Sequence, residues 1–166
     1  ADDHKLFLQE SKCVQVSYVL PKEIKEIEKG HFFIDFGQEI TGQFQMCAKG
    51  LPGQVVEIRC GEELEEGVDN RVRYDMRCNC KYQEYWTLSG GEDLLEYFDY
   101  KAFRYVEVIG IDQNMDLWNF RAIVRHYPFE DELCKFESSE PLLNGVWNIC
   151  RNAVKYGTQE SFVDCP

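Results

Sequence analysis

Apolar and polar residues alternate over short stretches of the first 125 residues, and this pattern predicts β-strands. In residues 43–49 apolar side chains alternate with polar ones, Gln45 among them, as in a sheet with one face toward solvent. The Pro52-Gly53 pair supplies the backbone torsions of a tight turn, and a second alternating segment follows at residues 56–60. We therefore expect these two segments to form a β-hairpin.

Weaker patterns predict the other elements of this region. The charged residues 22–29 are typical of a short helix or a solvated loop, and Gly37 and Gly42 are expected to bracket a turn after a strand. β-Branched and aromatic residues predict further strands, which we place at residues 13–20, 32–36, 82–88, 94–98, 103–109 and 117–124.

The order of these elements indicates the fold class. Short strands separated by glycine and proline turns, with no long helix between them, predict an antiparallel β-sandwich of the jelly-roll kind. We place this domain at residues 1–128 and expect Pro128 and the acidic residues after it to form its exit. Residues 129–166 are then expected to form a linker and one C-terminal helix.

Residues 138–156 carry the pattern of a capped helix. Apolar or small side chains recur every three or four positions from Leu143 to Gly157, so one face of the helix is apolar throughout. We expect Ser138 and Ser139 to cap its first turn. Gly157 is expected to end it in the left-handed conformation.

The apolar face of this helix predicts a partner. An isolated helix of this length is marginal in water, and Leu143, Val146, Trp147 and Val154 would leave a large apolar surface uncovered. We expect this face either to fold back on the sandwich or to pair with the same helix of a second molecule, and we favour pairing. The isolated chain is therefore expected to self-associate through its C-terminal helix.

The charge of the chain excludes several partners. Its formal net charge is −12, whereas a phosphate-binding surface needs a basic stripe, so we expect no nucleic acid partner. No apolar stretch approaches the ~20 residues that span a bilayer, and the first residues lack the features of a signal peptide, so we expect no membrane partner. The acidic residues 62–66 are typical of solvated surface and lack calcium-loop spacing.

The chain contains eight cysteines, several of them inside apolar patterns. Their density is below that of a disulfide-rich secreted domain, so we expect reduced thiols and a cytoplasmic location. Cys47, Cys60 and Cys150 are expected to be buried as small hydrophobic residues. Cys78 and Cys80 form the one close pair, and because no second pair completes a zinc site, they predict a loop with free thiols and no metal.

Aromatic rings on an acidic sandwich would admit stacking on sugars, but the strand positions of the candidates favour core packing. The candidates are Tyr85, Trp86, Tyr105 and Trp118.

The histidines His4, His31 and His126 are widely separated and predict surface or satisfied core residues. The sequence has no glycine-rich phosphate cradle and no nucleophilic serine motif, so we expect no cofactor.

Several segments, in their order along the chain, resemble the bacterial α-L-rhamnosidases. The resemblance runs from about residue 31 to the end of the chain and is most specific in its combination with the terminal Asp164-Cys165-Pro166. The segments that carry it are residues 34–42, 61–64, 85–90, 103–108 and 142–166.

The resemblance implies a β-sandwich that precedes an (α/α)6-barrel catalytic domain, of which residues 129–166 would be the start. It implies an inverting glycoside hydrolase that needs no metal and removes terminal α-L-rhamnose from a glycan or plant glycoside. Inversion requires a carboxylic acid and a carboxylate about 6.5–9.5 Å apart. By the resemblance Asp164 binds the sugar, whereas the general-acid glutamate and the general base lie beyond Pro166, so we expect no catalytic residue within the chain.

Two functions from different classes remain open on the sequence alone. In the first, the chain is part of an α-L-rhamnosidase and is inactive by itself. In the second, it is a free-standing β-sandwich that binds carbohydrate or protein. Without its motif, Asp164 would be interpreted as an ordinary loop carboxylate.

Overall fold

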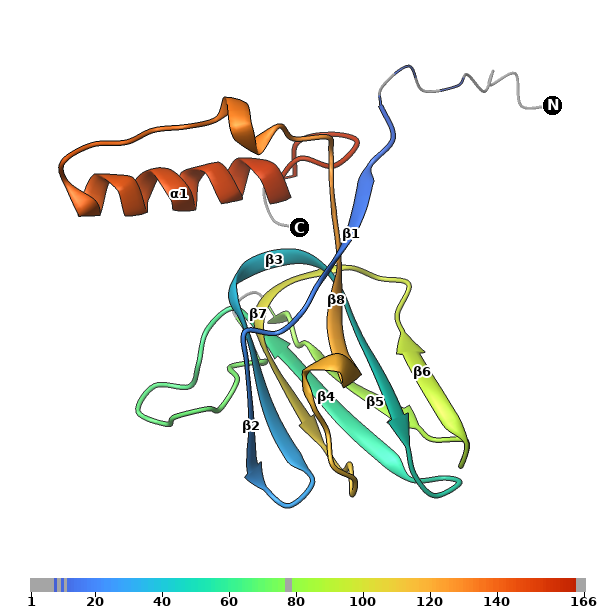
Figure 1. Ribbon diagram of the computed structural model, residues 1–166. Helices are drawn as coiled ribbons and strands as arrows, with labels where there is room; N and C mark the ends of the chain where they lie inside the picture. The colour runs from blue at the N-terminus through green and yellow to red at the C-terminus, as the bar shows by residue number, and fades with distance from the viewer. Residues whose placement is uncertain (1–7, 9, 11, 77–78, 164–166) are drawn as a thin grey trace. The chain divides into compact units, whose positions relative to one another are not determined.

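The computed structural model describes residues 8, 10, 12–76 and 79–163. The chain divides into two compact units: residues 16–124 form one, and the described residues before 16 together with 125–163 form the other. The elements, labelled in Figure 1, are β1 (Gln15–Val19), β2 (Glu23–Glu28), β3 (His31–Lys49), β4 (Val55–Gly61), β5 (Gln83–Thr87), β6 (Glu92–Glu96), β7 (Lys101–Ile109), β8 (Phe120–His126) and α1 (Pro141–Tyr156).

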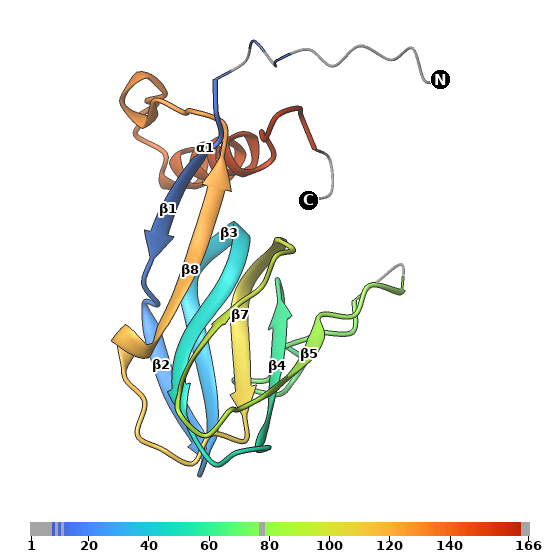
Figure 2. The same cartoon turned by 90° about the vertical axis from the view of Figure 1, so that its right-hand side faces the viewer.

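The first unit is an antiparallel β-sandwich organised around the long strand β3, which confirms the predicted fold class. The first part of β3 pairs with β2 and β7, and its last part pairs with β8 and β6. Between Asp35 and Ile40 the register with β7 shifts, and β3 bends (Figure 1). One strand therefore contributes to two ladders, and the strands follow in the order β1-β8-β3-β7-β4-β5 (Figure 2).

An ion pair and two glycines shape the bend in β3. Asp35 accepts hydrogen bonds from Arg104 Nε and Nη2, each at 2.9 Å, and from the Gly37 N–H at 2.6 Å. Burial alone would raise the pKa of Asp35, but these bonds hold it below its ordinary value. Gly37 has a φ of +81°, and a Cβ on Gly42 would lie 2.1 Å from the carbonyl oxygen of Ile123. The predicted turn is therefore wrong, because these glycines permit a bend and a close approach of β8 without ending the strand.

Within the charged residues 22–29, Glu23–Glu28 form the edge strand β2, so the prediction of a helix or a loop is wrong. β2 pairs with β3, with Ile24 opposite Ile34. Most of its side chains are exposed and several are charged, which is typical of edge strands that resist pairing with other chains. Pairing satisfies backbone groups of β3 that a local helix would leave open, and this requirement overrides the local propensity.

The two segments of the predicted hairpin are both strands, but they do not pair with each other. β4 pairs with β5 and β7, whereas the end of β3 pairs with β6 and β8. The turn itself is present, because Gly53 has a φ of +82° and the Gln54 N–H bonds to the Leu51 carbonyl at 3.0 Å. The hairpin prediction is wrong because this turn connects strands of different ladders. Turn chemistry fixes the chain reversal but not the pairing partners.

The core of the sandwich consists of large apolar side chains from the long strands. Phe44, Met46 and Ala48 are buried, as the alternation predicts. Gln45 was expected to face solvent but is only 2% exposed, because side chains of β6 and β8 cover it. The other fully buried residues include Ile34, Ile40, Val56, Ile58, Phe103, Val106, Val108 and Phe120.

The strand pattern predicts that the aromatic candidates pack in the core, but none of the four is fully buried. Trp118 is 77% exposed and Tyr85 is 62% exposed, while Trp86 and Tyr105 are half-buried. Trp118 lies in a 3-10 turn, where Asp116 Oδ1 accepts its N–H at 2.8 Å, so the strand begins only after it. Tyr85 lies on β5 at the end of the strand order, where an outward side chain has no neighbouring layer to cover it.

In the second unit, α1 confirms the predicted helix but not its caps. Glu140, and not a serine, accepts the Leu142 N–H at 3.1 Å. Ser138 instead accepts the Glu140 N–H at 3.2 Å, and it lies two residues before the capping position. Gly157 has a φ of −79°, because its N–H still bonds to the Ala153 carbonyl in the helical pattern. The prediction of a left-handed end is therefore wrong.

The predicted apolar face of α1 is exposed over much of its length. The exposed fraction is 51% for Leu143, 48% for Val146, 37% for Trp147 and 54% for Val154. The Trp147 ring packs against Phe136, with 5.3 Å between ring centroids. Within the described part of the chain, no helix is long and apolar enough to cross a membrane.

The described cysteines, at positions 13, 47, 60, 80, 134 and 150, are all free. Cys60 is buried as predicted, and burial raises the pKa of its thiol to about 12. Cys47 and Cys150 are exposed, so the prediction of burial is wrong for both. Cys47 lies on the outer face of β3, between the buried Met46 and Ala48, and Cys150 lies on α1.

Candidate functional site

Asp164, the candidate sugar-binding residue, lies outside the described residues, but the segment that leads to it is described. Residues 157–163 form what we call the terminal turn. Thr158 and Phe162 form an isolated β-bridge across it, and the Val163 N–H bonds to the Gly157 carbonyl at 2.7 Å. The backbone immediately before the candidate residue is therefore held by its own hydrogen bonds.

Gln159 fastens the terminal turn to the end of β8. Its side chain is 3% exposed, and its Nε2 donates to the carbonyl oxygens of Arg125 at 3.0 Å and Tyr156 at 3.2 Å. Its Oε1 accepts from Arg125 Nε at 3.3 Å. The Tyr127 N–H adds a bond of 2.7 Å to the Thr158 carbonyl. A buried amide that is satisfied at both ends fixes the position of the turn.

The last turn of α1 is held by contacts with Asp131 and His126. Lys155 Nζ lies 2.7 Å from Asp131 Oδ2, and this bond holds the pKa of Asp131 below its ordinary value. The Tyr156 and His126 rings meet edge to face, with 5.8 Å between centroids. His126 Nδ1 lies 2.7 Å from the Tyr127 carbonyl oxygen, so His126 is a satisfied core residue, as predicted. The polar groups of this region hold the backbone of the terminal turn and the last turn of α1.

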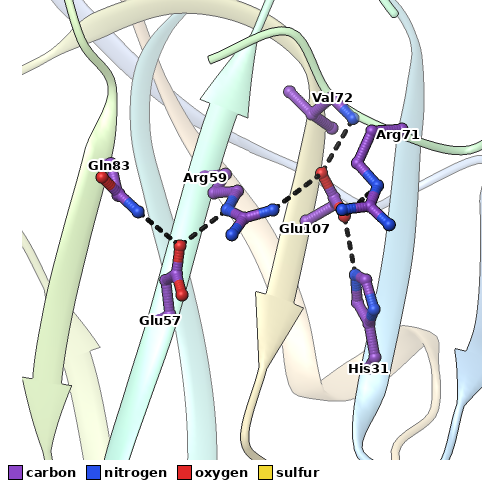
Figure 3. Close-up of polar contacts among 7 residues, drawn as sticks. All are labelled: His31, Glu57, Arg59, Arg71, Val72, Gln83 and Glu107. Atoms are coloured by element: carbon purple, nitrogen blue, oxygen red, sulfur yellow. Dashed lines mark hydrogen bonds and ion pairs between the residues drawn. The ribbon is translucent and has the colours of Figure 1, made fainter. Parts of the chain in front are cut away.

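A second polar region, the Glu107 cluster, lies on the sandwich and is drawn in Figure 3. The side chain of Glu107 on β7 is completely buried. His31 Nε2 lies 2.7 Å from its Oε1, and the Val72 N–H donates to its Oε2 at 2.8 Å. Arg71 Nε and Arg59 Nη1 approach it at 3.7 Å and 4.0 Å. One carboxylate thus joins β3, β4, β7 and the loop that precedes β5.

Arg59 links this carboxylate to Glu57, the other acid of the cluster (Figure 3). Glu57 Oε1 accepts from Arg59 Nε and Gln83 Nε2, each at 2.6 Å. Burial alone would raise the pKa of Glu57, but these hydrogen bonds hold it below its ordinary value. Burial would lower the pKa of Arg59, and the bond to Glu57 outweighs it, so the pKa is raised. Both ends of this pair therefore stay charged at neutral pH.

The Glu107 cluster does not have the properties of a hydrolytic site. A general acid must hold a proton next to the leaving oxygen, and a general base must reach a water molecule. Glu107 has no exposed surface and is surrounded by cations and a backbone N–H, while the low pKa of Glu57 keeps it unprotonated. The cluster instead fixes Arg71 and Val72, in the loop that precedes β5, to the sheet.

The sequence contains a signal for this cluster. Glu107 stands between Val106 and Val108, both buried, in a central strand. A carboxylate buried in this way requires cationic or N–H partners, so partners such as His31 and Arg59 had to exist. Gln159, by contrast, gave no signal, because it lies in a polar stretch that is typical of an ordinary loop.

The remaining candidates are two histidines and the close cysteine pair. His31 is a satisfied core residue, as predicted, and His4 lies outside the described residues. Cys80 is half-buried and free, while Cys78 also lies outside the described residues. In the ranges that the structure describes, no three His, Cys, Asp or Glu side chains are grouped as a metal site would require.

A family model for the bacterial alpha-L-rhamnosidase concanavalin-like domain matches residues 25–126. An alpha-L-rhamnosidase of Streptomyces avermitilis is 28% identical over 158 residues, which cover 92% of this chain and 14% of that protein. An alpha-L-rhamnosidase of Formosa agariphila is 24% identical over 159 residues, which cover 88% of this chain and 16% of that protein. The chain therefore spans about one-sixth or less of the curated relatives it matches.

Solved structures give the same picture of the fold. The alpha-L-rhamnosidase from Dictyoglumus thermophilum matches with a TM-score of 0.78 at 22% identity, over 94% of this chain and 18% of that one. The Streptomyces avermitilis alpha-L-rhamnosidase complexed with L-rhamnose matches with a TM-score of 0.75 at 25% identity, over 91% of this chain and 15% of that one.

Proposed function

The chain belongs to the bacterial α-L-rhamnosidase family, and from this premise we propose that it forms the β-sandwich and the first catalytic-domain helix of an enzyme that hydrolyses terminal α-L-rhamnosyl linkages with inversion. The extent of the likeness carries the proposal. Named alpha-L-rhamnosidases align with 88% to 92% of the chain, so the likeness extends beyond the sandwich model at residues 25–126. A free-standing sandwich would not need the helix and the terminal turn.

In this proposal the reaction belongs to a longer protein. Inverting hydrolysis uses two carboxyl groups about 6.5–9.5 Å apart, one as acid and one to activate water. In the two polar regions described above, Glu57, Glu107 and Asp131 are all paired with cations. As the family resemblance implies, the proposal takes the acid and the base from residues outside this chain, and its substrate is a rhamnosylated glycan or plant glycoside.

Within this chain, Asp164 is the residue we propose to bind the sugar. A carboxylate accepts hydrogen bonds from neighbouring hydroxyl groups, which is a common way to recognise a pyranose ring. The terminal turn supports this role because Gln159 fixes the backbone that leads to Asp164. A fixed approach lowers the conformational entropy that binding would otherwise cost.

Hydrolysis of an aryl α-L-rhamnoside tests the proposal. The 166-residue chain should give no turnover above background, whereas the full-length gene product should release rhamnose whose first-formed anomer is inverted. Proton NMR during the first minutes distinguishes the two anomers before they equilibrate. Turnover by the short chain would contradict the assignment of roles, and a retained anomer would contradict the mechanism.

We also propose that the isolated chain self-associates through the exposed apolar face of α1. Light scattering at ~100 μM should report a dimer, since an interface of about −6 kcal/mol would be populated at that concentration. The Trp147→Asp variant should be monomeric, and Asn148→Asp, which changes the neighbouring polar position, should behave like the parent chain. A monomeric parent chain would exclude this pairing.

A further inference from the structure

A shallow hollow of about 630 Å³ lies on the sandwich over β3, β6 and β8. In the strand register, Cys47 of β3 faces Leu94 of β6, and Lys49 faces Glu92. These side chains point away from the core, because the alternating Met46 and Ala48 are buried. We call this surface the outer-face hollow. Its lining includes Cys47, Lys49, Glu92, Leu94, Asn119 and Arg121.

One end of the outer-face hollow is fixed by a polar relay that crosses three strands. Gln45 Nε2 donates to Glu96 Oε2 at 2.6 Å, and Arg121 Nε donates to Gln45 Oε1. The guanidinium group of Arg121 also lies over the Tyr18 ring, 4.6 Å from its centroid. These contacts hold the plane of Arg121 in place. Its two terminal amino groups bond to no residue that the structure describes, so they stay free to donate.

Some other groups around the outer-face hollow are unpaired, whereas Asp93 and Gln113 of its lining have hydrogen-bond partners. Lys49 Nζ and the Glu92 carboxylate lie on facing positions, yet in the described residues neither has an ion-pair or hydrogen-bond partner. Asn119 uses its Oδ1 to accept the Asp116 N–H, which leaves its amide donors free among the described residues. Donors and acceptors therefore surround a small apolar floor of exposed Cys47 and Leu94, the latter 54% exposed.

This combination of groups restricts the chemistry of a ligand. The two cations at Lys49 and Arg121 balance the two carboxylates at Glu92 and Asp93, so the hollow favours neither a cationic nor an anionic ligand over a neutral one. The unpaired donors and acceptor instead match a neutral molecule that carries many hydroxyl groups. The apolar floor matches a patch of C–H groups on the same molecule. A pyranose ring has both properties.

We propose that the outer-face hollow binds a neutral saccharide. Arg121 and Asn119 donate hydrogen bonds to its hydroxyl groups, Glu92 accepts from them, and Leu94 and Cys47 contact its C–H face. The proposal of this site is argued from the geometry of the sandwich. Only the choice of a rhamnoside as the first probe rests on the proposed function. The hollow would thereby hold part of a glycan on the sandwich.

Cys47 provides a direct test, because it lies in the floor and is exposed. The 166-residue chain is treated with N-ethylmaleimide, and peptide mass spectrometry gives the alkylation rate of each thiol with and without about 100 mM methyl α-L-rhamnoside, enough to saturate a millimolar site. The sugar should slow the alkylation of Cys47 about fivefold or more. Cys13 and Cys150 are also exposed and are not among the lining residues, so they serve as internal controls whose rates should not change.

Two further probes fix the ligand class. Cellobiose, a neutral saccharide without rhamnose, should also protect Cys47 if hydroxyl groups and the C–H face are the features recognised. Galacturonate, an anionic sugar of similar size, should protect Cys47 at least fivefold less than a neutral monosaccharide, because a lining with balanced charges does not offset the desolvation of its carboxylate. Equal protection by galacturonate would overturn the inference of a neutral ligand.

Variants separate binding from folding. Lys49→Ala and Glu92→Ala remove unpaired groups, and either should weaken protection while the unfolding temperature stays the same. Arg121→Ala removes the fixed donor and should weaken the affinity about tenfold. Arg73→Ala, in the loop that precedes β5, is the matched control with unchanged protection. Protection that none of the three variants reduces would overturn the proposed site.

The test is independent of hydrolysis. Absence of protection by every neutral saccharide, or equal protection of Cys13, Cys47 and Cys150, would overturn this inference and leave the rhamnosidase proposal untouched. Conversely, an inactive full-length protein would contradict the rhamnosidase proposal, while protection of Cys47 by a neutral saccharide would still establish the binding site.

Discussion

The Glu107 cluster and the outer-face hollow are both built from charged and polar side chains of the sandwich. They differ in how many of these groups have a hydrogen-bond or ion-pair partner. In the Glu107 cluster, one buried carboxylate meets His31, Arg59, Arg71 and the Val72 N–H. In the outer-face hollow, Lys49 and Glu92 stand on facing positions without a partner among the described residues. The polar groups of the first region satisfy one another, and the second region leaves several of its donors and acceptors to solvent or to a ligand.

This difference indicates what each region contributes. Polar groups that satisfy one another in the interior fix the backbone, and removing one of them leaves the others buried without a partner. Polar groups that stay unpaired at the surface contribute little to stability. They can instead exchange water for a ligand at small cost. The contrast predicts that substitutions in the two regions have separate effects.

The largest effect is expected at Glu107. The Glu107→Ala variant leaves the largely buried His31 and Arg59 and the Val72 N–H without their carboxylate partner, so it should lower the free energy of unfolding by about 3–5 kcal/mol. Denaturation in urea, followed by circular dichroism, measures the change. Glu92→Ala removes a carboxylate of the outer-face hollow and should change the free energy by less than about 0.5 kcal/mol. Equal losses in the two variants would remove the distinction between the regions.

A smaller effect is expected at the bend of β3, where Asp35 is half-buried and paired with Arg104. The Asp35→Asn variant should lower the free energy of unfolding by about 1–2 kcal/mol at pH 7. The pKa of Asp35 is lowered in the folded state, so its stabilisation is present above the unfolded pKa of about 3.9 and is lost as the pH falls through the folded value.

Urea denaturation at pH 7 and at about pH 3 tests this dependence. The parent chain and Asp35→Asn should differ at pH 7 and converge in acid. Asp69→Asn, in the exposed loop before β5, is the matched control and should equal the parent chain at both pH values. A difference that grows in acid would show that the ion pair with Arg104 is not what Asp35 contributes.

The sequence predicts the strands of the sandwich better than their pairing. Alternation locates the buried positions of β3 and β4, since side-chain direction depends on the local period alone. Pairing depends on distant segments, which is why residues 22–29 became an edge strand and the Pro52-Gly53 turn joined two ladders. Gln45 is buried for the same reason, because its cover comes from Arg121 and Glu96.

The two polar regions differ in how well the sequence predicts them. Asp164 was selected through its Asp-Cys-Pro motif alone, and nothing in the local pattern marks Gln159 as its support. Glu107 could have been found, since an acid between two apolar residues of a central strand requires partners. The outer-face hollow could not, because its side chains come from three strands whose order the sequence does not reveal.

The most direct test of the account compares Asp164→Asn with Glu107→Gln in the full-length gene product. If Asp164 binds the sugar and Glu107 builds the sandwich, Asp164→Asn should lower kcat/KM for an aryl α-L-rhamnoside about 100-fold with an unchanged unfolding temperature. Glu107→Gln should lower the unfolding temperature and keep kcat/KM per folded enzyme within about twofold. An Asp164→Asn enzyme with the kcat/KM of the parent would contradict the account.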